Sequence, residues 1–188
     1  MNNQEQNIRA NIIEIGRRLY QQGLIVATEG NISARVDKDF LLITAAQSCK
    51  GFLNDKDVIA CDYTGRAAEG KESSEIYMHL AVYRLRPDAN AVIHAHPPHV
   101  VACSLAGLRF GDDLLPEIRL GIGKIGWAGF APPSRREGAD AVSQVIGDCE
   151  AVVLDRHGAL TLGKTLEEAF YRMERLEFAA RVFLLAKF

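Results

Sequence analysis

The chain has 188 residues, of which 48% are hydrophobic and 24% charged, a composition typical of a globular protein rather than a disordered one. Its formal net charge is −2, so it lacks the positive excess that non-specific nucleic-acid binding requires. No apolar run approaches the roughly 20 residues of a membrane helix, and the N-terminal segment lacks the apolar core of a signal peptide. We therefore expect no nucleic-acid partner, no membrane association and a cytoplasmic location.

Helical and strand-like patterns alternate along the first half of the chain. Apolar residues recur at helical spacing over residues 8–22. Three strands are predicted next, at residues 32–36, 40–44 and 58–63. Ser73 or Ser74 can cap a helix that runs to about Arg86, where Pro87 prevents its continuation.

The alternation continues through the second half. The sequence predicts a short buried strand at residues 91–96 and a helix from Pro97-Pro98 through Ala106. The glycine-rich stretch 107–133 is the least regular part, and only short strands are expected in it. The remaining predicted elements are a helix opened by the capping box Ser134–Glu137 and running to about Ile146, strands at 151–155 and 159–162, and a C-terminal helix opened by the capping box Thr165–Glu168.

These elements predict one α/β domain over residues 1–188, with helices packed on a mixed sheet. The four cysteines are widely spaced and form no CxxC pair. This spacing favours reduced thiols over a disulfide framework or a thiolate metal site.

Two histidines lie two residues apart in the predicted strand 91–96. Residues at this spacing point to the same face of a strand, so His94 and His96 would project side by side from an otherwise apolar segment. Two adjacent imidazoles are costly to bury without partners, and zinc or a similar divalent transition metal is a suitable partner. A hydrogen-bonded core pair is the alternative.

A third metal ligand could come from His157, which follows an apolar strand and precedes Gly158. Three histidines with an open fourth position are typical of a catalytic zinc site rather than a structural one. We interpret the other two histidines, His79 and His99, as structural hydrogen bonders, with His99 near a pocket edge.

Glu75 is the best carboxylate candidate. It follows Ser73 and Ser74 at a predicted helix N-terminus, where free backbone N–H groups favour anions. A simple helix cap with an acidic first turn is the alternative. The turn that ends in Asn31 is likewise either an ordinary turn or a turn whose backbone amides and Asn31 side chain bind an anion.

Four segments, taken in order, resemble the class II aldolase/adducin family: TEGNIS (28–33), SSE (73–75), RPDANAVIHAHPPH (86–99) and HGAL (157–160). The resemblance covers nearly the whole chain. It implies a three-layer α/β/α domain around a mixed, largely antiparallel sheet, and a homotetramer with active sites at subunit interfaces. The adducin-like branch lacks the metal histidines, so their presence here favours an active metalloenzyme.

The resemblance also implies roles: zinc ligands at His94, His96 and His157, an acid/base at Glu75, and phosphate-holding residues at Asn31, Ser73 and Ser74. The implied reaction cleaves a small ketose 1-phosphate into dihydroxyacetone phosphate and an aldehyde through a metal-stabilised enediolate. The expected partner is therefore a small phosphorylated sugar.

Among the departures from the family's aldolase pattern, two concern single site positions. Ala46-Gln47 stands where the phosphate loop usually carries Thr-Gly or Ser-Gly, although Lys50 lies near and can compensate. Leu120 stands where a tyrosine protonates the departing group, and Glu117 is the nearest ionisable alternative.

Other functions therefore stay open beside the aldolase. A sugar-phosphate epimerase or a dehydratase could use the same scaffold, and a dehydratase would depend on Glu117 as a second catalytic carboxylate. The Ala46-Gln47 loop also leaves room for a non-phosphorylated substrate. A non-catalytic binding module is the alternative among proteins that are not enzymes.

Overall fold

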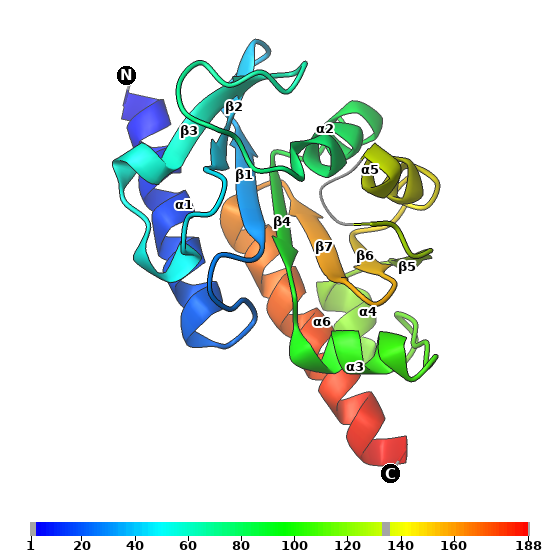
Figure 1. Ribbon diagram of the computed structural model, residues 1–188. Helices are drawn as coiled ribbons and strands as arrows, with labels where there is room; N and C mark the ends of the chain where they lie inside the picture. Colours follow the sequence, from blue (N-terminus) through cyan, green and yellow to red (C-terminus); the bar gives the residue numbers. More distant parts are fainter. Residues whose placement is uncertain (1–2, 133–135, 188) are drawn as a thin grey trace.

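The structure is a computed structural model that describes residues 3–132 and 136–187. Figure 1 shows helices on both faces of a seven-stranded sheet, whose strand order is β3-β2-β1-β4-β7-β6-β5. The strands are β1 (Asn31–Arg35), β2 (Phe40–Thr44), β3 (Val58–Asp62), β4 (Ala91–Ala95), β5 (Ile125–Ala128), β6 (Ala151–Leu154) and β7 (Gly158–Gly163). Neighbouring strands are antiparallel except for β5 and β6, which run parallel.

The helices are α1 (Asn3–Gln21), α2 (Ile76–Leu85), α3 (Pro98–Leu105), α4 (Pro116–Gly121), α5 (Arg136–Ser143) and α6 (Leu166–Lys187), with short 3-10 helices η1 (Lys50–Phe52) and η2 (Asp55–Asp57). One face of the sheet packs against α1, α3, α4 and α6, and the opposite face packs against α2 and α5. The predicted three-layer α/β/α architecture with a mixed, largely antiparallel sheet is therefore confirmed.

The central strand β4 is apolar on both sides because helices cover both faces of the sheet. Ile93 is buried against the layer of α1 and α6, whereas Val92 is buried against the layer of α2 and α5. A strand buried on both faces is expected to read as a continuous apolar run. His94, which follows directly and is fully buried, is the exception in this strand.

Most predicted elements occur within one or two residues of their expected bounds, and the differences are informative. The helix of residues 8–22 begins earlier, at Asn3. The prediction that Ser73 or Ser74 caps α2 is wrong, because the helix begins at Ile76 and Ser73 Oγ instead accepts a hydrogen bond from the Glu75 backbone N–H at 3.3 Å. The irregular stretch contains α4 besides the expected short strand β5, since Pro116 suits a first helical turn.

The two capping boxes have different outcomes. Thr165 Oγ1 accepts from the Glu168 backbone N–H at 3.1 Å as predicted, but the Glu168 carboxylate accepts from the backbone of Lys164 rather than of Thr165. Ser134 lies outside the described residues, and α5 ends at Ser143, three residues before the predicted end.

The four cysteines are free thiols, as predicted. Within the described ranges, no helix is both long and apolar enough to cross a membrane.

Candidate functional site

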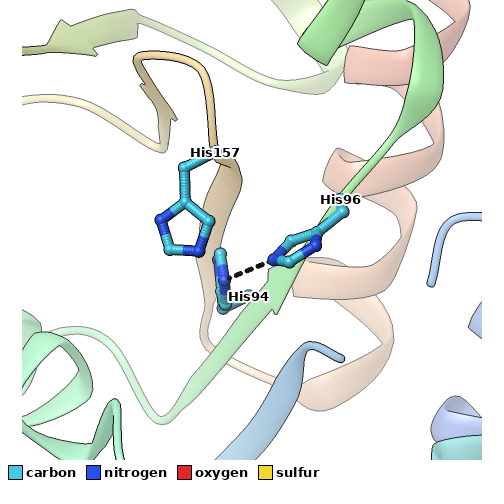
Figure 2. A group of neighbouring side chains, drawn as sticks. All are labelled: His94, His96 and His157. Carbon is cyan, nitrogen blue, oxygen red and sulfur yellow. Dashed lines mark hydrogen bonds between the residues drawn. The ribbon is translucent and has the colours of Figure 1, made fainter. Parts of the chain in front are cut away.

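Three histidines that are far apart in the sequence converge at one end of the sheet. His94 lies in β4, His96 follows the end of that strand, and His157 lies in the turn between β6 and β7. Because β4 pairs with β7, this turn returns beside the two strand histidines. Figure 2 shows the three rings facing one another, with ring centroids 4.8–5.0 Å apart and ligand nitrogens all within 4.8 Å.

Hydrogen bonds set the tautomers of the two strand histidines. His94 Nδ1 lies 3.0 Å from the backbone oxygen of Ala159, and His96 Nδ1 lies 2.8 Å from Glu29 Oε2. Both partners are acceptors, so each Nδ1 carries a hydrogen and each Nε2 presents a lone pair. The two Nε2 atoms are 3.1 Å apart (Figure 2). Two lone pairs at this distance repel unless an added proton or a shared cation lies between them.

The donor set fits a metal ion. Burial lowers the pKa of His96, and it lowers the pKa of His157 to about 4, which favours neutral rings near neutral pH. Zinc–nitrogen bonds of about 2.0–2.1 Å in a tetrahedron place ligand nitrogens roughly 3.3 Å apart, close to the 3.1 Å between the Nε2 atoms of His94 and His96. His94, His96 and His157 can therefore hold a divalent transition metal, while three imidazoles alone do not select zinc.

Glu75 lies against this histidine cluster. Its Oε2 accepts from Asn31 Nδ2 at 2.9 Å and is 3.2 Å from His94 Nε2. Its buried Oε1 is 3.4 Å from His157 Nε2 and accepts no hydrogen bond from any residue that the structure describes. Burial alone would raise the pKa of Glu75, but positive charge on the neighbouring rings of His94 and His157, when the cluster holds a proton or a cation, and the hydrogen bond from Asn31 hold it well below its usual range. The site thus presents an ionised carboxylate with one unpaired oxygen.

A cleft of about 590 Å³ opens beside the cluster. Besides Glu75, His96 and His157, its lining includes Thr28, Glu29, Gly30, Asn31, Ala45, Ala46, Gln47, Lys50, Lys71, Ser73 and Ser74. The structure therefore brings together the predicted Asn31, Ser73 and Ser74 with the metal histidines and Glu75. Hydroxyl, amide and ammonium groups along one wall make the cleft suitable for an anionic small molecule.

The remaining predicted residues lie elsewhere. Glu117 and Leu120 are exposed on α4 and do not line this cleft. His99 has a structural contact, since its Nδ1 lies 2.6 Å from Glu177 Oε1 on α6. His79 is fully buried and hydrogen-bonded on both ring nitrogens, as its interpretation as a structural residue requires.

Glu29 is a site residue that the sequence analysis missed. Its carboxylate accepts from His96 although the two residues are 67 positions apart. The sequence did offer one indication of this role, because Glu29 stands directly before Gly30 and Asn31. Gly30 has a positive φ of 69°, and a Cβ there would lie 2.8 Å from the His94 backbone oxygen, so this turn must pass close to β4.

Replacing Glu29 with Ala is expected to weaken metal binding about 10–100-fold, because outer partners of ligating histidines orient the ring and raise its basicity. Competition against a chromogenic chelator measures this affinity without any substrate. Glu14→Ala, which removes an exposed carboxylate on α1, is the matched control. Equal affinities in both variants would contradict the role of Glu29.

The turn that carries His157 is fixed from several sides. Arg156 has a positive φ of 54°, and its backbone N–H donates to Ser104 Oγ at 2.7 Å. Ser104 in turn donates to Asp155 Oδ1 at 2.7 Å. The turn therefore positions the His157 ring through its backbone and not only through side-chain packing.

Gly158→Ala is expected to lower the free energy of unfolding by about 1–3 kcal/mol and to weaken metal binding. An added Cβ would lie 2.3 Å from the Ala95 backbone oxygen and 2.8 Å from His96 Cδ2, so the strand or the ligand must shift. Urea unfolding and chelator competition measure the two effects. Gly147→Ala is the control, because its Cβ would meet nothing within 4 Å. Identical behaviour of the two variants would argue against a packing constraint at Gly158.

Three histidines that can hold a metal ion, with a carboxylate beside them in a cleft of an α/β/α domain, are the features that identify the class of protein. Residues 10–184 match the family model described as the class II aldolase and adducin N-terminal domain. The chain belongs to this family.

Named relatives carry more than one activity. An "L-fuculose phosphate aldolase" of Methanococcus vannielii is 36% identical over 170 residues, covering 90% of this chain and 92% of the relative. A "3-oxo-tetronate 4-phosphate decarboxylase" of Cupriavidus necator is 32% identical over 188 residues, covering 97% and 86%. The crystal structure of L-fuculose-1-phosphate aldolase from Thermus thermophilus is similar, with a TM-score of 0.85, 31% identity and coverage of 96% and 94%.

Proposed function

We propose that this protein is a zinc-dependent aldolase that cleaves a small ketose 1-phosphate, of the L-fuculose 1-phosphate type, into dihydroxyacetone phosphate and an aldehyde. The observation that carries the proposal is Glu75, whose unpaired Oε1 lies beside three converging histidines. The similarity to L-fuculose phosphate aldolases over most of the chain supports it.

The chemistry follows from the placement of Glu75. A metal ion held by the three histidines would polarise a substrate carbonyl and its neighbouring hydroxyl as a Lewis acid. In the condensation direction, Glu75 Oε1 has free lone pairs and can take a proton from the hydroxymethyl carbon of dihydroxyacetone phosphate, which leaves an enediolate. In cleavage the C4 hydroxyl gives its proton to solvent and becomes the aldehyde as the C3–C4 bond breaks, and the electron pair of that bond stays on C3 as the same enediolate. Protonated Glu75 then delivers its proton to C3. The side chain of Glu75 is only 10% exposed, so water has limited access to this proton.

Anionic groups of the substrate have several partners in the cleft. Ser73 and Ser74 line it beside Glu75, and Lys50 and Lys71 add positive charge near Ala46-Gln47. Lys50 is almost fully buried, and its ammonium donates to the backbone oxygens of Thr28 at 2.7 Å and Ser48 at 2.8 Å. Its third N–H bond remains for a ligand. We propose that Lys50 takes over part of the phosphate binding that a Thr-Gly pair would otherwise supply.

Burial lowers the pKa of Lys50 to about 8, so its charge is present below that pH and is lost above it. Lys50→Met is expected to raise the KM for dihydroxyacetone phosphate about tenfold at neutral pH, since a charged hydrogen bond is removed. The wild-type KM should rise between pH 7 and pH 9, and the variant should lose that rise. Lys124→Met, which alters an exposed lysine paired with Asp148, should keep the wild-type profile. An unchanged KM in Lys50→Met would remove Lys50 from substrate binding.

A decarboxylase is the second candidate, favoured by the relative from Cupriavidus necator. Loss of CO2 from a 3-oxo-tetronate 4-phosphate leaves the electron pair of the broken C1–C2 bond on C2, conjugated with the C3 carbonyl. The result is the enediolate of dihydroxyacetone phosphate, the same species that aldol cleavage yields. Both reactions therefore need the same acid at Glu75, and they differ only in the group that departs.

The first experiment uses this shared half-reaction. The zinc-loaded protein is incubated with dihydroxyacetone phosphate in heavy water, and the hydroxymethyl protons are followed by NMR. Chelator-sensitive exchange is expected, and no exchange by a metal-loaded protein would overturn both readings. Product analysis with L-fuculose 1-phosphate and with a 3-oxo-tetronate 4-phosphate then separates an aldolase from a decarboxylase. An isomer or loss of water would instead identify an epimerase or a dehydratase.

We also propose a cytoplasmic homotetramer with the clefts at subunit contacts. Large apolar side chains are exposed on α3, α4 and α6, including Leu105, Leu120 and Phe178, which supports an assembly through these helices. Light scattering gives the mass in solution. In such an assembly Glu117 would reach a site only across a subunit contact.

A further inference from the structure

A chain of buried polar side chains leads from the core to Glu75. Tyr83 Oη is 2.8 Å from Ser33 Oγ, and Ser33 Oγ is 2.6 Å from His79 Nδ1. His79 Nε2 contacts Asn31 Oδ1, and Asn31 Nδ2 donates to Glu75 Oε2 at 2.9 Å. Ser33 and His79 are fully buried, and Asn31 and Tyr83 are 3% exposed. This series of hydrogen bonds is therefore shielded from water from Tyr83 up to the Glu75 carboxylate.

The direction of every hydrogen bond in this chain follows from its last member. A carboxylate only accepts, so the Asn31 NH2 group must face Glu75 and its Oδ1 must face His79. His79 Nε2 is then the donor and its Nδ1 the acceptor, which requires Ser33 to donate to His79. The remaining lone pair of Ser33 accepts from Tyr83. One consistent arrangement satisfies all five groups, and burial supports it by lowering the pKa of His79 to about 3, which keeps the ring neutral.

We propose that His79, held by Ser33 and Tyr83, is a positioning residue that fixes the orientation of the Asn31 amide and thereby selects Oε1 of Glu75 as the reacting oxygen. The inference rests on the proposed role of Glu75 as the base. It assigns to Asn31 the task of holding Oε2, while its second N–H bond stays available to a substrate oxygen.

A flipped Asn31 amide shows why the orientation matters. It would turn Oδ1 toward Glu75, and two acceptors would face each other at hydrogen-bond distance. Glu75 would move away from Asn31 to relieve this contact. A misplacement of about 1 Å in a reacting group can cost about 100-fold in rate. The rings and hydroxyls behind Asn31 prevent the flip, since His79 Nε2–H would then meet the NH2 group of Asn31.

Burying this series of polar side chains costs free energy that a purely structural core would avoid. Polar groups lose hydration when buried, and apolar side chains of similar size at Ser33 and His79 would avoid that cost. The neighbours of these residues on the α2 side of the sheet, such as Val82 and Val92, are apolar. The polar members form one continuous path, and it ends at the catalytic carboxylate.

The test compares His79→Leu, which removes both ring hydrogen bonds, with His79→Gln, whose amide can accept from Ser33 and donate to Asn31. The assay is exchange of dihydroxyacetone phosphate protons in heavy water by the zinc-loaded protein. His79→Leu is expected to lower kcat about 10–100-fold while KM changes less than about threefold. His79→Gln should recover most of kcat, and Tyr83→Phe should lose about threefold or less.

Met78→Leu, which alters a buried residue of α2 whose side chain is not a member of this series of hydrogen bonds, controls for packing. Wild-type kcat in His79→Leu, or equal loss in His79→Leu and His79→Gln, would overturn the inference. If His79→Leu does not fold, Ser33→Ala makes the same test, with a loss of about tenfold expected and wild-type kcat contradicting it.

Glu75→Gln, measured in parallel, separates the two levels of the argument. If Glu75→Gln keeps activity, the proposed function of Glu75 fails and this inference fails with it. If Glu75→Gln is inactive while His79→Leu has wild-type kcat, only the positioning role is overturned.

Discussion

Replacing Glu75 with Gln is expected to reduce the exchange of dihydroxyacetone phosphate protons about 10²–10⁴-fold, the usual range for loss of a general base. Glutamine has the size of glutamate, and its carbonyl oxygen can still accept from Asn31 Nδ2 in place of Oε2. Its amide nitrogen then occupies the position of Oε1 and cannot accept a proton. Zinc should stay bound, because the three imidazoles are unchanged. NMR exchange and elemental analysis measure the two properties.

Glu69→Gln is the matched control for this variant. Glu69 is exposed and lies six residues before Glu75, outside the lining of the cleft. It should leave the exchange rate and the zinc content unchanged. Wild-type turnover in Glu75→Gln would remove Glu75 from the role of the base, whatever the substrate.

His94→Ala is expected to lower metal affinity by more than about 100-fold, since even the outer partners of ligating histidines contribute 10–100-fold. His94 is fully buried beside His96 and His157, and its Nδ1 is held by the Ala159 backbone oxygen. Two ligands remain in the variant, and activity should fall with the metal content. Chelation of the wild-type protein should produce the same loss, and added zinc should reverse it only in the wild type.

His99→Ala controls for the removal of an imidazole. His99 binds Glu177 and does not belong to the cluster, so zinc stoichiometry should persist in this variant. Zinc should raise the melting temperature of the wild type and of His99→Ala, because a ligand that binds only the folded state stabilises it. His94→Ala should show no such rise. One tightly bound zinc per chain in His94→Ala would contradict the assignment.

The sequence predicted the parts of the fold and site that short-range patterns encode. The period of apolar residues located the strands around β4, and the spacing of His94 and His96 placed both rings on one face. The position of His157 before Gly158 could be interpreted because turns after buried strands commonly carry functional side chains. The predicted helix N-terminus singled out Glu75 with Ser73 and Ser74, and the family resemblance then added their roles as acid/base and phosphate-binding residues.

What the sequence did not predict depends on strand register and on pairs distant in the chain. His79 meets Asn31 because α2 packs against β1, and Glu29 meets His96 because β1 pairs with β4 in a register that places Asn31 opposite His94. No local pattern specifies that register. The start of α2 at Ile76 was missed for a related reason: Glu75 stands at the N-cap position, but its side chain lines the cleft with Ser73 and makes no capping hydrogen bond.

The position of β4 in the sheet has a consequence for the unfolded chain. On one side of β4 lie strands from residues 31–62, and on the other lie strands from residues 125–163. An ion bound to His96 and His157 would link two points separated by roughly 60 residues, and closing a loop of that length removes considerable entropy from the denatured ensemble. Such a link forms only after distant segments have met, which makes it a late contact in folding. The three imidazoles would thus act as a reversible cross-link between β4 and the turn that joins β6 to β7.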